Sequence, residues 1–236
     1  MLTLLKKNIH GFTYLLRHPN QLKHIIIRET LYRQRNQNRQ GWVEWQKYDT
    51  YTAAAQHSTA IAYARPLNLA RIQTFSTMVS SIGNRLMVLD VGCGDGVISE
   101  PISKMGNYVT SIDLPTITMV AHKRRVSSVV SGDAEQLAFK PNSFDLVLAS
   151  EVVEHLWNPN SFFEEATRVL KPKGHLIIET PEGKEGLRYD AHKHYFTVEI
   201  LKQMLDTRFN IAKVKRLKPN LGAPTPTIIV LFTKKQ

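Results

Sequence analysis

Apolar side chains in the first 82 residues recur every three or four positions, the spacing that places them on one face of a helix. Segment 4–16 shows this pattern, and a second such segment follows the break at 18–20. Residues 33–40 are polar, rich in amides and without apolar periodicity, so we expect a loop there. Aromatic residues then recur every third position and predict another helix: Trp42, Trp45, Tyr48 and Tyr51.

A further helix is predicted to begin at Pro66, because proline is well tolerated in the first turn of a helix. Its apolar residues recur at intervals of three and four, on the side that we expect to be buried: Leu69, Ile72, Phe75 and Val79. Residues 1–82 are therefore predicted to form a helical N-terminal cap or arm.

From residue 86 short apolar runs alternate with helical segments. Runs of strand length lie at 86–91, 108–112, 128–131, 144–149 and 176–179, and helices are predicted at 97–105, 161–170 and 198–205. A turn is predicted at 171–174, and the last two runs, 211–217 and 227–232, are expected to form a hairpin. Strands that are apolar throughout are typical of a parallel sheet covered on both faces, so residues 83–236 are predicted to form an α/β domain.

The chain carries 31 Lys and Arg against 20 Asp and Glu, which gives a formal net charge of +11. The excess is uneven: residues 1–85 carry +9, residues 86–180 carry −4 and residues 181–236 carry +6. Basic arms of this kind attract anionic partners, and they also serve as a solvated surface. Three partners therefore remain open for the basic N-terminal arm: an anionic membrane surface, RNA and a second copy of the chain.

Neither a transmembrane helix nor a signal peptide is predicted. The longest uncharged apolar runs have strand length, well below the roughly 20 residues that span a bilayer. Lys6 and Lys7 are not followed by an extended apolar stretch with a cleavage site. The single cysteine, Cys93, cannot form an internal disulfide. We therefore expect a cytoplasmic protein, with peripheral attachment to the membrane as an open alternative.

A glycine-rich loop, Asp90–Gly96, lies between the first predicted strand and the first helix that covers the sheet. An open α/β sheet binds nucleotide-like ligands at this place, where glycines allow positive φ and a close backbone approach. Val97 stands where a dinucleotide-binding loop has its third glycine, which counts against a pyrophosphate cofactor. Asp113 ends the next strand, 21 residues after Gly92, where a carboxylate can accept both hydroxyls of a ribose.

Several stretches in order resemble the motifs of class I S-adenosylmethionine-dependent methyltransferases: Val88–Gly96, Ser111–Asp113, Gly132–Leu137, Phe144–Val147 and Arg168–Gly174. The resemblance departs at Lys173, where glycine is common. It implies a Rossmann-like, mostly parallel sheet of seven strands with a C-terminal antiparallel hairpin, and S-adenosylmethionine as cofactor. The residues that it implies for cofactor binding are Asp90, Gly92, Cys93, Gly94, Gly96, Asp113 for the ribose, Leu114, Asp133 for the adenine, Ala134 and Ser150.

An acidic–histidine cluster, Glu151-Val152-Val153-Glu154-His155, follows the fourth predicted strand. If it forms the first turn of a helix, Glu151, Glu154 and His155 share one face. Two interpretations are open. Carboxylates at a helix start are favoured by the macrodipole, and the histidine there is then simply hydrogen-bonded. Alternatively the three side chains hold a divalent cation, or His155 is a general base.

The cluster is similar to the E-x-x-E-H sequence of the O-methyltransferases of ubiquinone biosynthesis and their bacterial relatives, down to the following Asn158-Pro159. This resemblance implies methylation of a hydroxyl of a small acceptor, with aromatic and lipid-linked acceptors both open, and with or without a divalent ion. His155 and Glu151 are the predicted catalytic residues. The predicted metal ligands are Glu151, Glu154, His155 and His194; carboxylates favour Mg²⁺, and imidazoles leave manganese or zinc open.

A second resemblance leads to a different substrate. The small-RNA 3′-end 2′-O-methyltransferases also use an E-x-x-E-H cluster, with a later histidine from a turn that His192-x-His194-x-Phe196 matches. The basic arms suit RNA, but the sequence contains no separate RNA-binding module, so a small-molecule acceptor is favoured. A non-catalytic methyltransferase-like interaction module is the third alternative, and the intact cofactor motifs argue against it.

Overall fold

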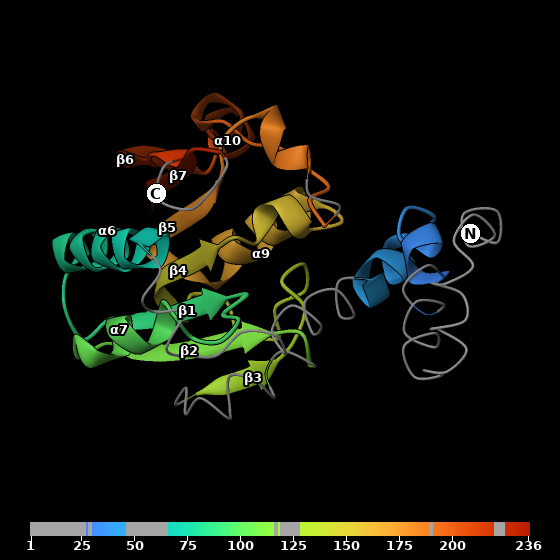
Figure 1. The fold of residues 1–236 in the computed structure, drawn as a ribbon. Coiled ribbons are helices and arrows are strands. Elements are labelled where there is room, and N and C mark those ends of the chain that lie inside the picture. Colours follow the sequence, from blue (N-terminus) through green and yellow to red (C-terminus); the bar gives the residue numbers. More distant parts are fainter. Residues whose placement is uncertain are drawn as a thin grey trace, which may run out of the picture. The chain divides into compact units, whose positions relative to one another are not determined.

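A computed structural model gives the structure of the chain (Figure 1). It describes residues 27, 30–45, 66–115, 118, 128–188, 191–219 and 225–236. The chain divides into two compact units, Met1–Asp49 and Thr50–Gln236. The helices predicted in 4–26, and the positions of Tyr48 and Tyr51, lie outside the described residues. The boundary between an arm and a methyltransferase domain at residues 82/83 stays a prediction. Within the described residues, no helix combines the length and apolarity needed to cross a bilayer.

In the first unit, the loop predicted over residues 33–40 is confined to a short turn. Residues 30–34 and 39–45 are helical, with a turn at 35–37. The prediction was wrong in extent because Asn38 caps the second helix: its Oδ1 accepts a hydrogen bond from the Gly41 amide at 2.8 Å. The helix predicted from the aromatic spacing is confirmed for Trp42 and Trp45, whose side chains are buried.

The second unit is built on one seven-stranded sheet with the order β3-β2-β1-β4-β5-β7-β6. Its strands are β1 (Met87–Val91), β2 (Tyr108–Asp113), β3 (Val129–Ser131), β4 (Phe144–Ser150), β5 (Leu170–Pro181), β6 (Phe209–Leu217) and β7 (Thr227–Lys234). β1 to β5 pair in parallel, and β7 runs antiparallel to both β5 and β6. The predicted mostly parallel sheet with a C-terminal hairpin is thus confirmed.

Helices cover both faces of this sheet. They are α6 (Pro66–Ile82), α7 (Ser99–Lys104), α9 (Pro159–Val169) and α10 (Val198–Leu205), with the short 3₁₀ helices η1 (Val153–His155) and η2 (Lys184–Arg188). One apolar core lies under α6 and α7 and contains Phe75 and Ile102; the other lies under α9 and α10 and contains Phe163 and Leu201. Each face of the sheet is therefore closed by apolar contacts, as fully apolar strands require.

α6 begins at Pro66 as predicted, but its buried side is centred elsewhere. Phe75, Met78 and Val79 are buried, whereas Leu69 is 55% exposed, so its predicted burial was wrong. At 100° per residue Leu69 lies about 120° around the helix from Phe75, outside the face that contacts the sheet. The position on that face one turn before Phe75 is occupied by Arg71, which makes polar contacts described below.

The turn predicted at residues 171–174 lies within β5 as a bulge. Phe144 pairs with Leu170 but Leu146 pairs with His175, so four residues of β5 are accommodated without partners in β4. Lys173, in the bulge, has a φ of 62°, in the left-handed region that glycine adopts without strain. This geometry gives the physical reason why glycine suits this position.

β6 forms one edge of the sheet. Lys215 pairs with Ile229, which belongs to the core under α6, so Lys215 points to the same side of the sheet as α6. Both Lys213 and Lys215 are exposed.

Candidate active site

The candidate site lies at the carboxyl ends of β1, β2, β4 and β5. The strand order reverses between β1 and β4, which is where open α/β sheets bind ligands. The glycine loop follows β1, and its three glycines all have left-handed φ, 69° at Gly92, 55° at Gly94 and 83° at Gly96. The loop lies against the segment after β4: a Cβ at Gly92 would be 2.3 Å from Cγ2 of Val152.

Asp113 is held at the end of β2 by the loop itself. Its Oδ2 accepts a hydrogen bond from the Gly94 amide at 2.8 Å, and its Oδ1 accepts one from the Leu114 amide at 2.7 Å. Burial raises the pKa of Asp113 to about 6, against these two hydrogen bonds, which lower it. The carboxylate that we expect to bind a ribose is therefore oriented before any ligand arrives.

Other predicted cofactor residues lie deeper in the fold. Asp90 is buried and accepts a hydrogen bond from the Ser99 hydroxyl, and burial raises its pKa to about 7. Cys93 is buried, and burial, followed by the charges of Asp90 and Asp113, raises the pKa of its thiol. Cys93 therefore packs as a small neutral side chain.

The loop after β3 places the residues implied for the adenine. Asp133 accepts a hydrogen bond from the Glu135 amide at 2.9 Å, and Ala134 packs against the core under α9. Glu135 in turn accepts a hydrogen bond from the Trp157 amide at 2.8 Å. This loop is thereby fixed to the segment that follows η1.

The acidic–histidine segment does not start an α-helix, so the condition under which its three side chains would share one face is not met. Glu151 has a φ of 56°, which turns the chain sharply after β4, and residues 153–155 form a single 3₁₀ turn. Leu156 is extended, and the α-helix begins only at Pro159, capped by the Asn158 side chain. Glu151 therefore does not share a helix face with Glu154 and His155.

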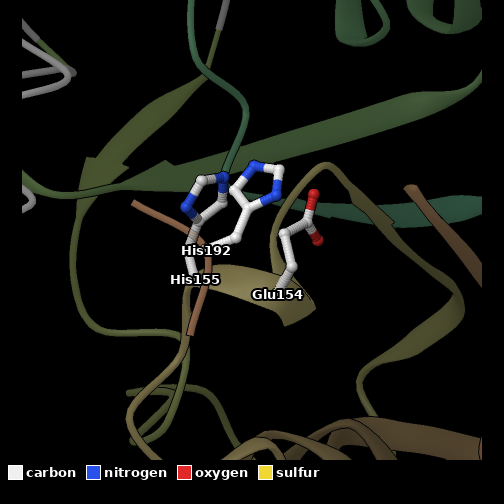
Figure 2. A group of neighbouring side chains, drawn as sticks. All are labelled: Glu154, His155 and His192. Atoms are coloured by element: carbon white, nitrogen blue, oxygen red, sulfur yellow. The ribbon is translucent and has the colours of Figure 1, made fainter. Parts of the chain in front are cut away.

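Glu154 and His155 are brought together with His192, which comes from the segment after η2 (Figure 2). One potential ligand atom from each of the three side chains lies within 4.8 Å of the others. The His155 and His192 rings meet edge to face with centroids 4.7 Å apart. Glu154 is buried, its Oε2 accepts a hydrogen bond from the Thr180 hydroxyl at 3.0 Å, and its Oε1 has no hydrogen-bond partner among the described residues.

Both histidines of this cluster are held in the same tautomer. His155 Nδ1 lies 2.8 Å from the Ala191 carbonyl oxygen, and His192 Nδ1 lies 2.8 Å from the Gly186 carbonyl oxygen. A carbonyl oxygen only accepts, so each Nδ1 carries a proton, and in the neutral ring Nε2 is then the nitrogen without one. Imidazole acts as a base or as a metal ligand in this form.

Burial dominates the electrostatics of the cluster. It raises the pKa of Glu154 to about 8 and, together with the charges of Glu154 and Glu179, raises the pKa of Glu151. It lowers the pKa of His192 to about 4, with a further contribution from His155. The site therefore disfavours uncompensated negative charge and keeps His192 neutral.

The later histidine of the cluster is His192, whereas the sequence pattern led us to expect His194. His194, the predicted ligand, lies outside the cluster, and its Nε2 contacts the Leu156 carbonyl oxygen at 3.0 Å. His192 takes the place beside His155 because the amides of Lys193 and His194 both contact the Glu154 carbonyl oxygen, which fixes the path of this segment. In an extended segment residues two apart point to the same side, so the H-x-H spacing alone does not decide between His192 and His194.

Arg71 and Glu179 also contribute to the site and were absent from the sequence prediction. Arg71 Nε lies 2.8 and 2.9 Å from the two carboxylate oxygens of Glu179, and its Nη2 lies 2.7 Å from the Ser150 hydroxyl. The predicted cofactor residue Ser150 thus lies between an arginine and a buried carboxylate.

Comparison with known proteins places these features in context. A family model described as a methyltransferase domain matches residues 89–178. A ubiquinone biosynthesis O-methyltransferase of Xanthomonas euvesicatoria is 39% identical over 121 residues, which are 48% of this chain and 50% of that protein. The protein of the same name from Xylella fastidiosa is 36% identical over 121 residues, 48% of each chain. The match thus spans about half the length of these relatives.

Solved structures share the fold. The N-methyltransferase NodS of Bradyrhizobium japonicum, in complex with S-adenosyl-L-homocysteine, superposes with a TM-score of 0.66 at 19% identity, over 79% of this chain and 99% of NodS. The YcgJ protein of Bacillus subtilis superposes with a TM-score of 0.60 at 16% identity, over 70% and 99% of the two chains. At these identities the likeness concerns the fold alone.

Proposed function

We propose, from the premise that residues 89–178 form a class I S-adenosylmethionine-dependent methyltransferase domain, that this chain transfers a methyl group to a hydroxyl oxygen of a small acceptor. The observation that carries the proposal is the joint position of two groups at one end of the sheet. The glycine loop with Asp113 suits a nucleoside, and the loop lies against Val152 of the turn that carries Glu154 and His155, which meet His192.

The residues around the glycine loop fit S-adenosylmethionine. Asp113 offers oriented carboxylate oxygens for the ribose hydroxyls, and Asp133 lies after β3, where the adenine amine is expected. At Gly94, whose amide donates to Asp113, an added Cβ would meet nothing within 4 Å, so the loop backbone there is open to the methionine part of the ligand. The cofactor supplies a methyl group on a positively charged sulfur, which carboxylate-rich surroundings favour.

The cluster after β4 is suited to activate the acceptor. A hydroxyl is a weak nucleophile, and removal of its proton as it attacks lowers the barrier to methyl transfer. His192 presents a neutral imidazole whose Nδ1 is held by the Gly186 carbonyl oxygen, so its Nε2 can accept this proton. His155 lies beside it with its own Nδ1 held by the Ala191 carbonyl oxygen. The positive charge that His192 then gains favours the ionised form of nearby Glu154, whose pKa burial raises to about 8, so the two charges compensate each other.

The same donors fit a divalent cation. Glu154, His155 and His192 would hold it, because the Nδ1 atoms of both histidines are fixed by carbonyl oxygens and Oε1 of Glu154 is buried without a partner among the described residues. Such an ion supplies Lewis acidity, which lowers the pKa of a bound hydroxyl. Two imidazoles and one carboxylate suit manganese or zinc better than Mg²⁺.

Calorimetry with S-adenosylmethionine, followed by transfer of a labelled methyl group, tests the proposal. We expect binding of the cofactor and label transfer to a catechol but not to short RNA. If EDTA and Glu154→Gln each abolish turnover, a bound metal ion is supported. If turnover is unchanged after chelation, the metal-assisted mechanism is refuted. Mass spectrometry of a metabolite pool before and after reaction identifies the acceptor. Absence of cofactor binding refutes the proposal and favours a non-catalytic interaction module.

RNA methylation at a ribose 2′-hydroxyl is the second candidate. It is favoured by the presence of His192 beside Glu154 and His155 and by the charge of +9 on residues 1–85. Label transferred to short RNA, and lost when the salt concentration is raised, would put this function first.

For the partners we propose contact of the basic N-terminal arm with an anionic membrane surface, where a lipid-linked acceptor resides. Flotation with vesicles that contain phosphatidylglycerol is expected for the full chain and not for a chain that starts near Trp42. Equal flotation of the two chains, or of neither, contradicts this proposal, and sedimentation of the full chain as a dimer supports a contact between copies instead.

A further inference from the structure

Arg71 is a buried charge that the proposed chemistry does not use. It lies on α6, one helical turn before Phe75, on the face that covers the sheet. Its side chain is 13% exposed, and its partner Glu179, at the end of β5, is fully buried. Arginine is rarely buried unless it is paired, so this contact has a specific role in the fold or the site.

Two short paths lead from the Arg71–Glu179 pair to the acceptor-activating cluster. Ser150, which Arg71 contacts at 2.7 Å, donates a hydrogen bond to Glu179 and directly precedes the left-handed turn at Glu151. The Glu151 amide in turn donates to the Glu179 carbonyl oxygen at 3.0 Å. The next residue of β5, Thr180, donates to Glu154 at 3.0 Å. The turn from Ser150 to Glu154 is thus attached to β5 at both ends.

Charge balance at this place also depends on Arg71. Glu151, Glu154 and Glu179 lie close enough to influence one another, and the positive charge of Arg71 lowers the pKa of both Glu151 and Glu154 against the effect of burial. Burial lowers the pKa of Arg71, but the negative charges of Glu179 and Glu151 outweigh this effect and raise it, so the guanidinium stays charged. A buried carboxylate that loses its partner is costly and tends to rearrange its surroundings.

We propose that Arg71 is a positioning residue that, through Glu179 and Ser150, holds the Glu151–His155 turn in the arrangement that activates the acceptor. α6, which precedes the glycine loop in the chain, thereby helps to position the acceptor site through Arg71. This inference rests on the proposed methyl transfer, but the position of the turn itself is measurable without turnover.

Hydrogen exchange of the full chain, read on peptides that cover residues 148–157, tests the proposal together with the thermal midpoint and with kcat and KM for methylation of a catechol. We expect Arg71→Met to speed exchange at the Glu151 and His155 amides and to lower kcat by about 100-fold, the loss typical of a small misplacement of catalytic groups. Arg71→Lys keeps the charge but not the forked geometry, so its exchange rate and its kcat should lie between those of the wild type and those of Arg71→Met. The matched control is Lys171→Met, which removes the half-buried Lys171–Asp145 pair. This pair lies at the ends of β4 and β5 opposite to Ser150 and Glu179, so its loss should change neither exchange nor kcat.

The double variant Arg71→Met/Glu179→Gln separates positioning from mere stabilisation, and it also serves if Arg71→Met alone does not fold. It removes the unpaired carboxylate, so the thermal midpoint should recover, while exchange stays fast and kcat stays low. Recovery of kcat together with the midpoint, or wild-type exchange in Arg71→Met, overturns the proposal. If the wild-type chain methylates no hydroxylated acceptor, the proposed function fails, and the exchange data still decide the role of Arg71.

Discussion

The contact between the glycine loop and the turn after β4 makes Gly92→Ala a sharp test of the site. At Gly92 the backbone φ is 69°, and an added Cβ would lie 2.3 Å from Cγ2 of Val152. The left-handed backbone costs alanine about 1–2 kcal/mol, and the overpacking against Val152 costs about 1–3 kcal/mol more. The expected loss is about 2–5 kcal/mol, a large share of the stability of a typical domain.

Gly94→Ala is the matched control for the backbone part of this loss. Its φ is 55°, but nothing lies within 4 Å of the added Cβ, so we expect a loss of about 1–2 kcal/mol. Urea unfolding followed by circular dichroism measures both losses, and a double-mutant cycle with Val152→Ala isolates the clash. Val152→Ala should recover about 1–3 kcal/mol of the Gly92→Ala loss and nothing of the Gly94→Ala loss. Equal losses for the two alanine variants, with a coupling energy near zero, would show that the loop and the turn do not touch.

Three further predictions address the cofactor, the cluster and the fold. Affinity for S-adenosylhomocysteine should weaken by up to about tenfold per pH unit as the pH falls below about 6, because protonation of Asp113 removes the acceptor for the ribose hydroxyls; calorimetry should find this dependence absent in Asp113→Asn. Initial rates with a catechol should fall by about 100-fold or more in His192→Ala and far less in His194→Ala, and equal losses would contradict the geometry. Lys173→Gly should raise the free energy of unfolding in urea by about 0.5–1 kcal/mol, since glycine adopts a left-handed φ without strain. A lower free energy of unfolding would mean that the bulge in β5 does not require a left-handed φ at residue 173.

Features that depend on neighbouring residues in the chain could be predicted from the sequence. The glycine loop and Asp113 follow from the rule that parallel strands present their carboxyl ends at one edge, and the structure joins them by the hydrogen bond from the Gly94 amide to Asp113. The period of apolar residues likewise predicted the strands and the C-terminal hairpin. Local periodicity was less reliable for Leu69, where a polar residue, Arg71, shifts the buried face of α6.

Features that depend on long-range contacts were missed. Arg71 and Glu179 are 108 residues apart, and nothing in either local sequence indicates the other. The choice between His192 and His194 is set by the path of the segment after η2, which two backbone hydrogen bonds to the Glu154 carbonyl oxygen fix. The 3₁₀ turn at residues 153–155 depends on the left-handed Glu151, a conformation uncommon for a residue with a Cβ.

The lysines of β6 bear on how the protein behaves at high concentration. An edge strand of nine residues offers unpaired backbone groups to any extended chain, including a second molecule of the same protein. Such pairing would bring Lys213 and Lys215 close to the same lysines of the other molecule, and like charges across two strands repel. Repulsion between the lysines of β6 therefore disfavours aggregation by edge-to-edge pairing of sheets, and salt weakens this repulsion by screening the charges.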